Sequence, residues 1–194
     1  TGLIDCEALE AALVRAKAEK RKLIIGTFSA ASNVTGIVQD CPTICKLLHQ
    51  YGALAFWDFA AAAPYIKVDM NPMASTEADR GLVHRDALFL SPHKFPGGVC
   101  TPGILVAKKF LFDRKLSPAH PGGGTVEFVT PEDQLYHSKI SEREESGTPD
   151  IVGCIRAGLD FQLKHSVTPE LIESLESRLY AKRLLNSRRI LAFP

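Results

Sequence analysis

Residues 86–98 read DALFLSPHKFPGG, an apolar run that breaks abruptly into a turn. The run over residues 86–90 is typical of a buried strand, and Pro96 with the two glycines behind it forces the chain to turn. Lys94 therefore lies where the strand leaves its sheet. A lysine held beside apolar walls can lose its proton near neutral pH and form an imine with an aldehyde, whereas most loop lysines are solvated surface residues. This stretch alone leaves both interpretations open.

The chain around this stretch alternates between helical and strand patterns. Asp5 is a possible helix N-cap, and Gly52 is placed to end a second helix. Compact apolar runs between the helices are typical of strands. The expected helices cover residues 6–20 and 37–51, and the expected strands cover residues 22–27, 53–59 and 103–107. Strand and helix alternation at this spacing predicts an α/β fold with parallel strands.

Polar side chains follow three of the expected strands. Asn33, Asp58 and Lys94 lie in the loops where these strands end. The carboxyl ends of parallel strands share one edge of a sheet, so we expect the three side chains to converge on one ligand. The alternative is structural, with Asn33 as a turn residue and Asp58 as the N-cap of the next helix.

The second half of the chain gives weaker signals. Residues 64–85 form a mixed connection with at most a short helix, and the glycines at 122–124 lack the spacing of a dinucleotide-binding motif. Further helices are expected over residues 151–165 and from Pro169 onward. Thr148 precedes the first of them, where a hydroxyl and backbone amides could bind phosphate. An exposed charged loop is the alternative at this position.

The composition argues against several classes of partner. With 194 residues, 45% hydrophobic content and a net charge of +1, the chain can build one core and has no basic block to attract nucleic acid or a membrane surface. No apolar run reaches the roughly 18 residues of a membrane-spanning helix. The chain opens without an initiator Met and stops directly after a helical pattern, so we expect a fragment of a longer protein.

Five cysteines without a regular framework favour a reducing compartment. We expect an intracellular protein, with the cytoplasm favoured over an organelle. Cys41 and Cys45 have the C-x3-C spacing of a possible metal pair. No second pair follows at zinc-ligand spacing, so we predict two buried thiols and no metal site.

Taken together, the motifs resemble the class V group of fold-type I pyridoxal-phosphate enzymes, most closely its cysteine desulfurase and selenocysteine lyase branch. The similarity runs through nearly the whole chain and is carried by residues 2–5, 32–36, Asp58, 91–94, 122–124 and 145–149. It implies a three-layer α/β/α fold with a mainly parallel sheet, the incomplete large domain of a fold-type I transferase. Residues 1–165 would be the central part of that domain, and residues 166–194 a helix leading towards a C-terminal small domain.

The resemblance also implies a role for each candidate residue around pyridoxal 5'-phosphate. Lys94 would form the Schiff base with the cofactor aldehyde and later shuttle the proton at the substrate α-carbon. Asp58 would keep the pyridine nitrogen protonated, and Asn33 would hydrogen-bond the phenolic oxygen of the ring. Ser91 and His93 would hold the phosphate.

The same resemblance bears on oligomeric state and on missing parts. In relatives of this kind the threonine that matches Thr148 reaches the phosphate of the other subunit, which implies a homodimer. The persulfide-forming cysteine and the arginine that grips the substrate carboxylate would follow the last residue, so none of the five cysteines is nominated. Relatives usually carry a glutamine where Ala61 stands, and residues 71–85 make the connection before Lys94 longer than expected.

The resemblance implies an enzyme that acts on an amino acid, and the first hypothesis is the removal of sulfur from cysteine to give alanine. We expect the fragment to be inactive alone. A transaminase or another lyase of the same family is the second hypothesis. A degenerate domain with a structural or dimerisation role and no catalysis is the third.

Overall fold

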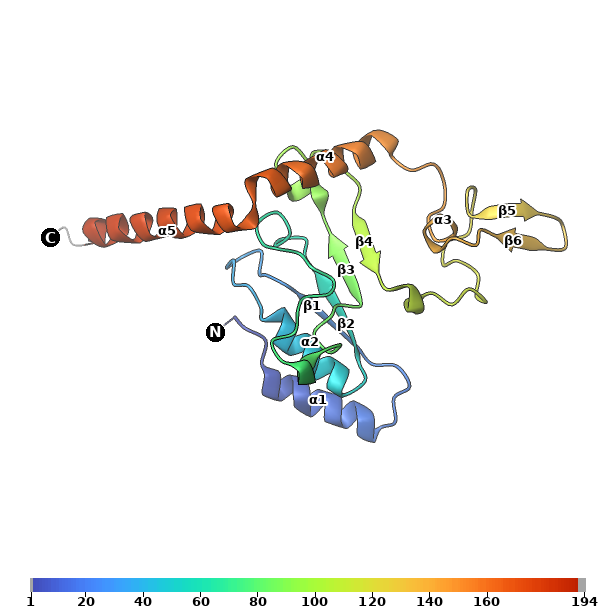
Figure 1. Cartoon of the computed structure of the whole chain (residues 1–194), viewed down its shortest axis with the longest axis horizontal. Coiled ribbons are helices and arrows are strands. Elements are labelled where there is room, and N and C mark those ends of the chain that lie inside the picture. The colour runs from blue at the N-terminus through green and yellow to red at the C-terminus, as the bar shows by residue number, and fades with distance from the viewer. Residues whose placement is uncertain (1, 192–194) are drawn as a thin grey trace.

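A computed structural model describes residues 2–191 of the chain, with side chains described as far as residue 183. Its centre is a four-stranded sheet in the order β1-β2-β3-β4, formed by Ile25–Ser29, Leu54–Asp58, Ala87–Leu90 and Ile104–Ala107. The first three strands run parallel, and β4 is antiparallel to β3. Figure 1 shows helices below and above these strands. A mainly parallel sheet flanked by helices confirms the predicted fold class.

Helices α1 (Cys6–Ala18) and α2 (Cys41–Gln50) lie together on one side of the sheet (Figure 1). The side chain of Asp5 accepts a hydrogen bond from the Ala8 amide at 3.0 Å, so the predicted N-cap is confirmed. Asp40 caps α2 in the same way. These caps supply acceptors to amides that have no partner within the first turn, and they fix where each helix begins.

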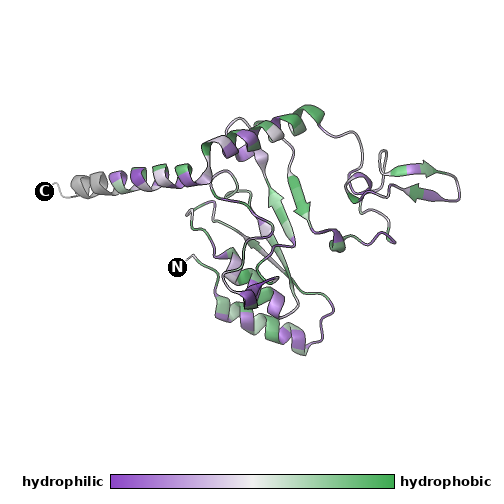
Figure 2. Cartoon of the chain, in the orientation of Figure 1, coloured by the Kyte–Doolittle hydropathy of each residue, from purple (hydrophilic) through white to green (hydrophobic). Residues whose placement is uncertain are grey.

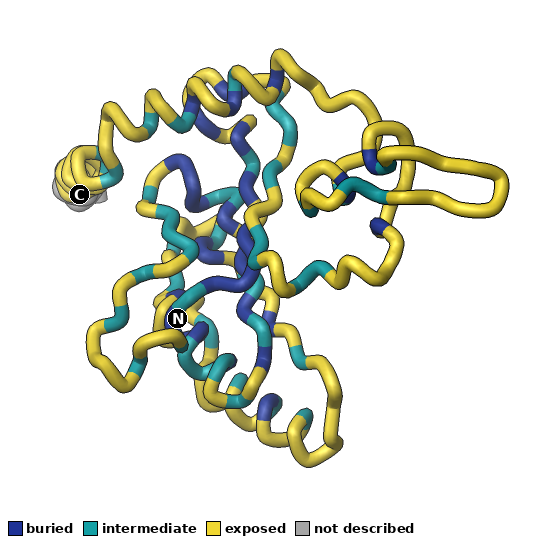
Figure 3. Tube along the Cα trace, turned by 45° about the vertical axis from the view of Figure 1, so that its right-hand side comes forward, coloured by how far each residue is buried: buried dark blue, intermediate teal, exposed yellow. Residues whose placement is uncertain are grey.

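The core lies between α2 and the first three strands. Leu48, Trp57 and Leu88 are almost fully buried there. Gly26 of β1 allows α2 to approach closely, since a Cβ at this position would lie 2.6 Å from Leu48 Cδ2. The Trp57 indole donates its Nε1–H to Cys45 Sγ at 3.1 Å. In Figure 3 the buried residues gather along the strands and α2, whereas the second half of the chain is mostly exposed.

The second half of the chain extends away from this core. A hairpin of β5 (Val126–Val129) and β6 (Gln134–Tyr136) precedes the short helix α3 (Ile140–Arg143). Helix α4 (Ile151–Val167) lies above the sheet, and α5 (Pro169–Leu191) runs out from the rest of the chain (Figure 1). Figure 2 shows apolar segments on the hairpin and on α4, and several of these apolar side chains are exposed.

Within residues 2–191, no helix combines the length and the apolar character needed to cross a membrane.

Several element boundaries differ from the sequence predictions. The strand expected over residues 22–27 begins only at Ile25, and the helix expected over residues 37–51 begins only at Cys41. The late start of α2 follows from the preceding turn, which is closed by an antiparallel bridge between Ala31 and Val38. The hairpin of β5 and β6 was not predicted from the sequence. The connection over 64–85 contains only η1 (Glu77–Asp79), which confirms the expectation of at most a short helix.

Candidate functional site

Three parallel strands end level with one another at one edge of the sheet. Asp58, the last residue of β2, pairs in register with Phe89 of β3 and with the last residue of β1. Asn33 follows β1 in the next turn, and Lys94 ends the 3-10 helix η2 (Pro92–Lys94), which follows β3. The loops that carry these three candidate residues therefore leave the sheet at the same edge, where open α/β sheets bind ligands.

Asp58 is fixed through its backbone and through one side-chain hydrogen bond. Its carbonyl oxygen accepts from the Ala30 amide at 2.8 Å, and the next amide, of Phe59, donates to the Phe89 carbonyl at 2.9 Å. Its Oδ1 accepts from the Ala60 amide at 2.7 Å. The segment behind it is a turn rather than a helix, so Asp58 is not a helix N-cap. In the described chain Oδ2 has no hydrogen-bond partner and stays open to a ligand.

Lys94 ends a turn that is anchored on both sides. Its amide donates to the Ser91 carbonyl at 3.0 Å, and the ring of Phe95 packs against Phe161 of α4 with the centroids 4.9 Å apart. The Lys94 side chain is exposed rather than enclosed by apolar side chains. Within residues 2–183 its ammonium makes no hydrogen bond or ion pair. The backbone is thus fixed while the amine remains available.

The turn after Lys94 depends on two glycines and faces a carboxylate from α4. Gly97 has a φ of +93°, and a Cβ on Gly98 would collide with the Pro92 carbonyl oxygen. The buried Asp160 lies against this turn, with Oδ1 and Oδ2 at 2.9 and 3.0 Å from the positions of those two Cβ atoms. Sequence reasoning missed Asp160. The signal that could have identified it is its position in the sequence of α4, where a charged residue follows small buried residues at helical intervals.

The other candidates on this edge are held in different ways. Ser91 is half-buried and His93 is exposed, and both belong to the segment that carries Lys94. Asn33 is exposed in a turn held by Ser32, whose Oγ accepts from the amides of residues 34 and 35 at 3.2 Å each. Among the described residues, the Asn33 side chain makes no hydrogen bond of its own, so its amide is not used to build the turn.

Thr148 lies apart from these segments. It is exposed in the connection between α3 and α4, where the Gly147 amide donates to the Gly123 carbonyl at 2.8 Å. The helix behind it is capped by Asp150, whose Oδ1 accepts from an amide of the first turn at 2.9 Å. Nowhere in the described chain does a hydrogen bond or ion pair join Thr148 to the segment around Lys94. The loops of five candidates thus share one edge, and Thr148 stays outside it.

A hollow of about 840 Å³ lies elsewhere, between β4 and the helices α3 and α4. Its lining is largely apolar and includes Ile104, Phe112, Ile140 and Phe161. None of the six candidate residues lines it. Charged residues such as Lys139 and Glu144 also line this hollow, and its size alone would make it a ligand site. The candidate site is placed at the strand ends because open α/β sheets bind ligands where their parallel strands end.

Burial shifts the pKa of three side chains that pack around the sheet. Desolvation raises the pKa of Cys45 to about 11 and also raises the pKa of Cys41, so both thiols stay protonated near neutral pH. Both are buried, as predicted. Burial also lowers the pKa of Lys164, whose Nζ donates to the carbonyl oxygens of Ala63 and Ile66 at 2.5 and 2.6 Å. Lys164 thereby ties α4 to the segment behind β2.

Comparison with known proteins reveals related sequences. The aminotransferase class-V family matches the chain over residues 1–190. A probable cysteine desulfurase from Haemophilus influenzae is 33% identical over 192 residues, covering 92% of this chain and 40% of that protein. A probable cysteine desulfurase from Borreliella burgdorferi is 32% identical over 169 residues, covering 84% of this chain and 35% of that protein. The chain thus spans well under half the length of these curated relatives.

Solved structures show the same relationship. The apo structure of cysteine desulfurase from Thermococcus onnurineus matches with a TM-score of 0.71 at 26% identity, covering 94% of this chain and 42% of that one. A cysteine desulfurase from Escherichia coli matches with a TM-score of 0.68 at 24% identity, covering 93% of this chain and 42% of that one. At this identity the likeness shows only the fold. The sequence match over nearly the full length shows that the chain belongs to the aminotransferase class-V family.

Proposed function

We propose that the chain is the central part of the pyridoxal-phosphate-binding domain of a cysteine desulfurase-like enzyme. Residues 1–165 would belong to that domain, and residues 166–194 would lead towards a separate small domain. One observation supports the proposal above all others. Asp58 and Lys94 leave adjacent parallel strands at the same edge, and the ammonium of Lys94 has no ion-pair partner within the described residues.

The side chains at this edge fit the chemical groups of the cofactor. An aldehyde requires an amine that no carboxylate has engaged, a pyridinium nitrogen requires a carboxylate, and a phosphate requires several hydrogen-bond donors. Lys94 and Asp58 offer the first two. Ser91 and His93 offer a hydroxyl and an imidazole, and Asn33 adds an amide on the neighbouring loop.

Pyridoxal phosphate, when bound, supplies an electron sink for negative charge that develops at the substrate α-carbon. The residues of this chain bind it and move a proton. Lys94 would hold the cofactor at its aldehyde, and its amine, when free, would carry the proton at the substrate α-carbon. Asp58 would hold the proton on the pyridine nitrogen, and the hydrogen bond from the Ala60 amide to Oδ1 keeps that carboxylate oriented.

The proposed substrate is cysteine, because the curated relatives are named as probable cysteine desulfurases. A thiol that takes up sulfur must be accessible and readily ionised. Cys41 and Cys45 are neither, since both are buried and burial raises both pKa values. Cys6, Cys100 and Cys154 are exposed, but none stands at the position that the resemblance implies for the persulfide-forming cysteine, so we nominate no cysteine of this chain for that role. The sulfur-accepting thiol and the arginine for the substrate carboxylate would come from the part of the enzyme that this chain does not span.

We further infer a homodimer in the cytoplasm. The resemblance assigns Thr148 to the phosphate site of a second copy, and the lack of any hydrogen bond or ion pair between Thr148 and the segment around Lys94 within the described residues supports this role. Exposed apolar side chains on the β5–β6 hairpin, such as Phe128 and Val129, supply surface that a second copy could cover. The five free cysteines fit a reducing compartment.

Borohydride reduction in the presence of pyridoxal phosphate, followed by peptide mapping, tests the proposal. Reduction fixes the cofactor to the lysine that has bound it, and we expect the label on Lys94. Lys94→Ala should abolish it, whereas Lys109→Ala, at an exposed lysine outside the site, should leave it unchanged. Label scattered over surface lysines of a folded chain would overturn the proposal for this chain and favour a structural or dimerisation role.

A further inference from the structure

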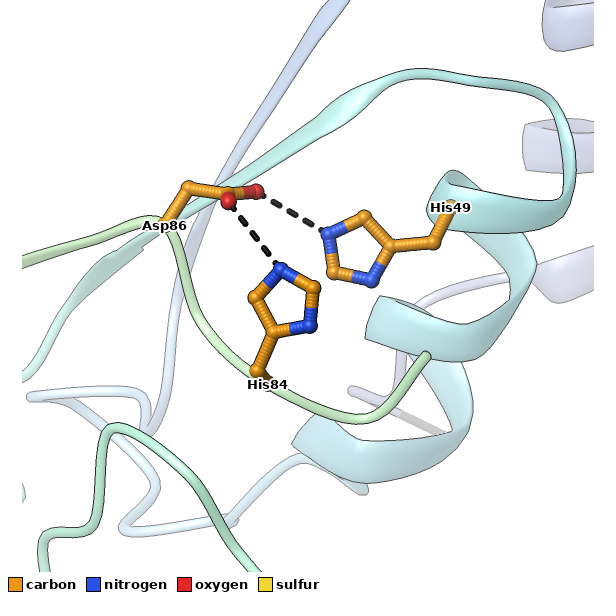
Figure 4. Close-up of side chains that lie close together, drawn as sticks. All are labelled: His49, His84 and Asp86. Carbon is orange, nitrogen blue, oxygen red and sulfur yellow. Dashed lines mark hydrogen bonds and ion pairs between the residues drawn. The ribbon is translucent and has the colours of Figure 1, made fainter. Parts of the chain in front are cut away.

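Three side chains meet at the opposite edge of the sheet from Lys94. His49 comes from α2, and His84 and Asp86 come from the segment that leads into β3 (Figure 4). The carboxylate of Asp86 lies beside the two rings and faces the Nε2 atom of each (Figure 4): His49 Nε2 is 3.0 Å from Oδ2, and His84 Nε2 is 3.2 Å from Oδ1. The side chain of Asp86 is 1% exposed, that of His49 10% and that of His84 28%. The cluster is therefore a largely enclosed polar site.

The hydrogen bonds on the far side of each ring fix the tautomer. His49 Nδ1 is 2.5 Å from the Leu82 carbonyl oxygen, and His84 Nδ1 is 2.8 Å from the Gly81 carbonyl oxygen. A carbonyl oxygen only accepts, so each Nδ1 must carry a proton. Each neutral ring then presents an Nε2 lone pair to a carboxylate oxygen. In each of the two contacts, a ring Nε2 and a carboxylate oxygen would then both be hydrogen-bond acceptors. Each contact therefore needs a proton or a cation between the two atoms.

Two protons or one metal ion could supply that charge. Protons would turn both rings into cations, yet the rings of His49 and His84 stack with centroids 4.1 Å apart and planes 15° apart, and like charges at this distance repel. Asp86 offers only one negative charge to two such rings. A single divalent cation can contact both lone pairs and the carboxylate once one ring has turned towards the other, and it leaves the rings neutral.

The donor set and its spacing suit such an ion. Ligands about 2.1 Å from one metal lie roughly 3.0–3.4 Å from each other. The two Nε2-to-oxygen distances of 3.0 and 3.2 Å, each to a different oxygen of Asp86, fall in this range, and the ligand atoms of all three residues lie within 4.8 Å of one another. Backbone carbonyls that accept from the second ring nitrogen are the usual outer partners of metal-binding histidines. We propose that His49, His84 and Asp86 form a binding site for a divalent transition-metal ion, with Zn²⁺ as the representative cation.

The nearly parallel rings require one adjustment. Both lone pairs can meet one ion only if a ring swings towards the other, since each lone pair lies in its own ring plane. His84 is the ring that moves, because it is more exposed and lies in the irregular connection before β3. Asp86 stays fixed by the Ala55 amide, which donates to Oδ2 at 2.7 Å, and His49 stays fixed on α2.

The bound ion would have a structural role. It would join α2 to the sheet and to the end of the connection over residues 64–85, which contains only one short helix. The four residues of β3 separate Asp86 from the turn that carries Lys94, so the ion would not reach the chemistry there. The site is independent of the proposed cofactor and would exist whether or not pyridoxal phosphate binds.

Metal titration of the chelator-stripped chain tests this site. Calorimetry with Zn²⁺ alone should give one ion per chain, and Co²⁺ alone should give a visible absorption band at the same stoichiometry. Zn²⁺ should also raise the midpoint of thermal unfolding, because the ion binds only the folded state. A folded chain that binds neither ion, and whose unfolding midpoint Zn²⁺ leaves unchanged, would overturn the proposal. Protons would then be the only positive charges between the two histidines and Asp86.

His84→Gln removes one ligand with little loss of packing, and His120→Gln is the matched control at an exposed loop position. His84→Gln should weaken Zn²⁺ binding by more than the roughly 10- to 100-fold typical of outer partners, and the control should leave it unchanged. Diethylpyrocarbonate labelling of the unmutated chain gives a second measurement that needs no variant. Zn²⁺ should protect His49 and His84 but not His120. Equal Zn²⁺ affinity in the two variants would contradict the site. So would labelling of His49 and His84 that Zn²⁺ leaves unchanged.

Discussion

The buried carboxylate of Asp160 lies against Gly98, in the turn that follows Lys94. Its Oδ2 is 3.0 Å from the position that a Cβ on residue 98 would take, and this oxygen has no hydrogen-bond partner among the described residues. Phe161, the next residue on α4, packs against Phe95 of the same turn. Helix α4 therefore supports the backbone that presents Lys94, although no residue of α4 is a candidate for the chemistry.

Gly98→Ala should destabilise the chain. The added Cβ would collide with the Pro92 carbonyl oxygen, and Asp160 closes the other side, so the backbone has little room to shift. We expect urea denaturation to show a loss of about 1–3 kcal/mol in unfolding free energy. Gly123→Ala is the control, since a Cβ there meets nothing within 4 Å. Equal stability of the two variants would show that the turn yields easily.

The sequence predicts this edge well because its signals are local. An apolar run that ends in a polar residue or a turn identifies a strand end, so Asp58 and Lys94 could be placed from their neighbours alone. Once the strands are taken as parallel, topology puts both residues at one edge. The assignment of Cys45 to the core rests on a different ground, because free cysteines are usually buried and no second pair of metal ligands follows at zinc-ligand spacing.

Contacts between distant segments are beyond this kind of reasoning. Asp160 meets the turn after Lys94 only because α4 folds back over the sheet, and His49 meets Asp86 across 37 residues of chain. Neither pair has a characteristic spacing. The β5–β6 hairpin was missed for another reason. Its strands are only four and three residues long, which is too short for a periodic pattern to stand out, although valine and phenylalanine are common in strands.

Asp58→Asn should weaken the binding of pyridoxal phosphate while leaving the fold intact. Asparagine keeps an oxygen that can accept from the Ala60 amide, so we expect the unfolding free energy to stay within about 0.5 kcal/mol. The variant loses the charge that holds the pyridinium proton, and cofactor affinity should fall at least roughly tenfold, which corresponds to about 1.4 kcal/mol. Absorbance titration with the cofactor measures this.

The control for this prediction is Asp113→Asn. Asp113 is exposed, and its Oδ1 accepts from the amide two residues on at 2.9 Å, just as that of Asp58 does at 2.7 Å. It should leave cofactor affinity unchanged, because it lies outside the proposed site. Equal affinity in both variants would remove Asp58 from the proposed set of cofactor contacts.

Thiol reactivity should divide the cysteines into two groups. Cys6, Cys100 and Cys154 are exposed, whereas Cys41 and Cys45 are buried with raised pKa values. Because the thiolate is the reactive form, a thiol reagent at pH 8 should modify the three exposed cysteines quickly and the two buried ones only after denaturation. Mass spectrometry of the modified peptides checks the assignment. Rapid modification of Cys45 in the native chain would mean that α2 opens readily from the sheet.

The raised pKa of Cys45 predicts a loss of stability at alkaline pH. The unfolded thiol ionises near 9.0, whereas burial raises the pKa in the folded chain to about 11. Below pH 9 both states hold the proton, and between pH 9 and 11 only the folded state does, so unfolding becomes easier by up to roughly 1.4 kcal/mol per pH unit. In Cys45→Ala this contribution is absent, so the stability difference from the unmodified chain should change over that window. Cys154→Ala, at an exposed position, is the control, and its difference in unfolding free energy from the unmodified chain should stay constant with pH. If the pH curves of the two variants ran parallel, burial of the Cys45 thiol would not account for the alkaline loss of stability.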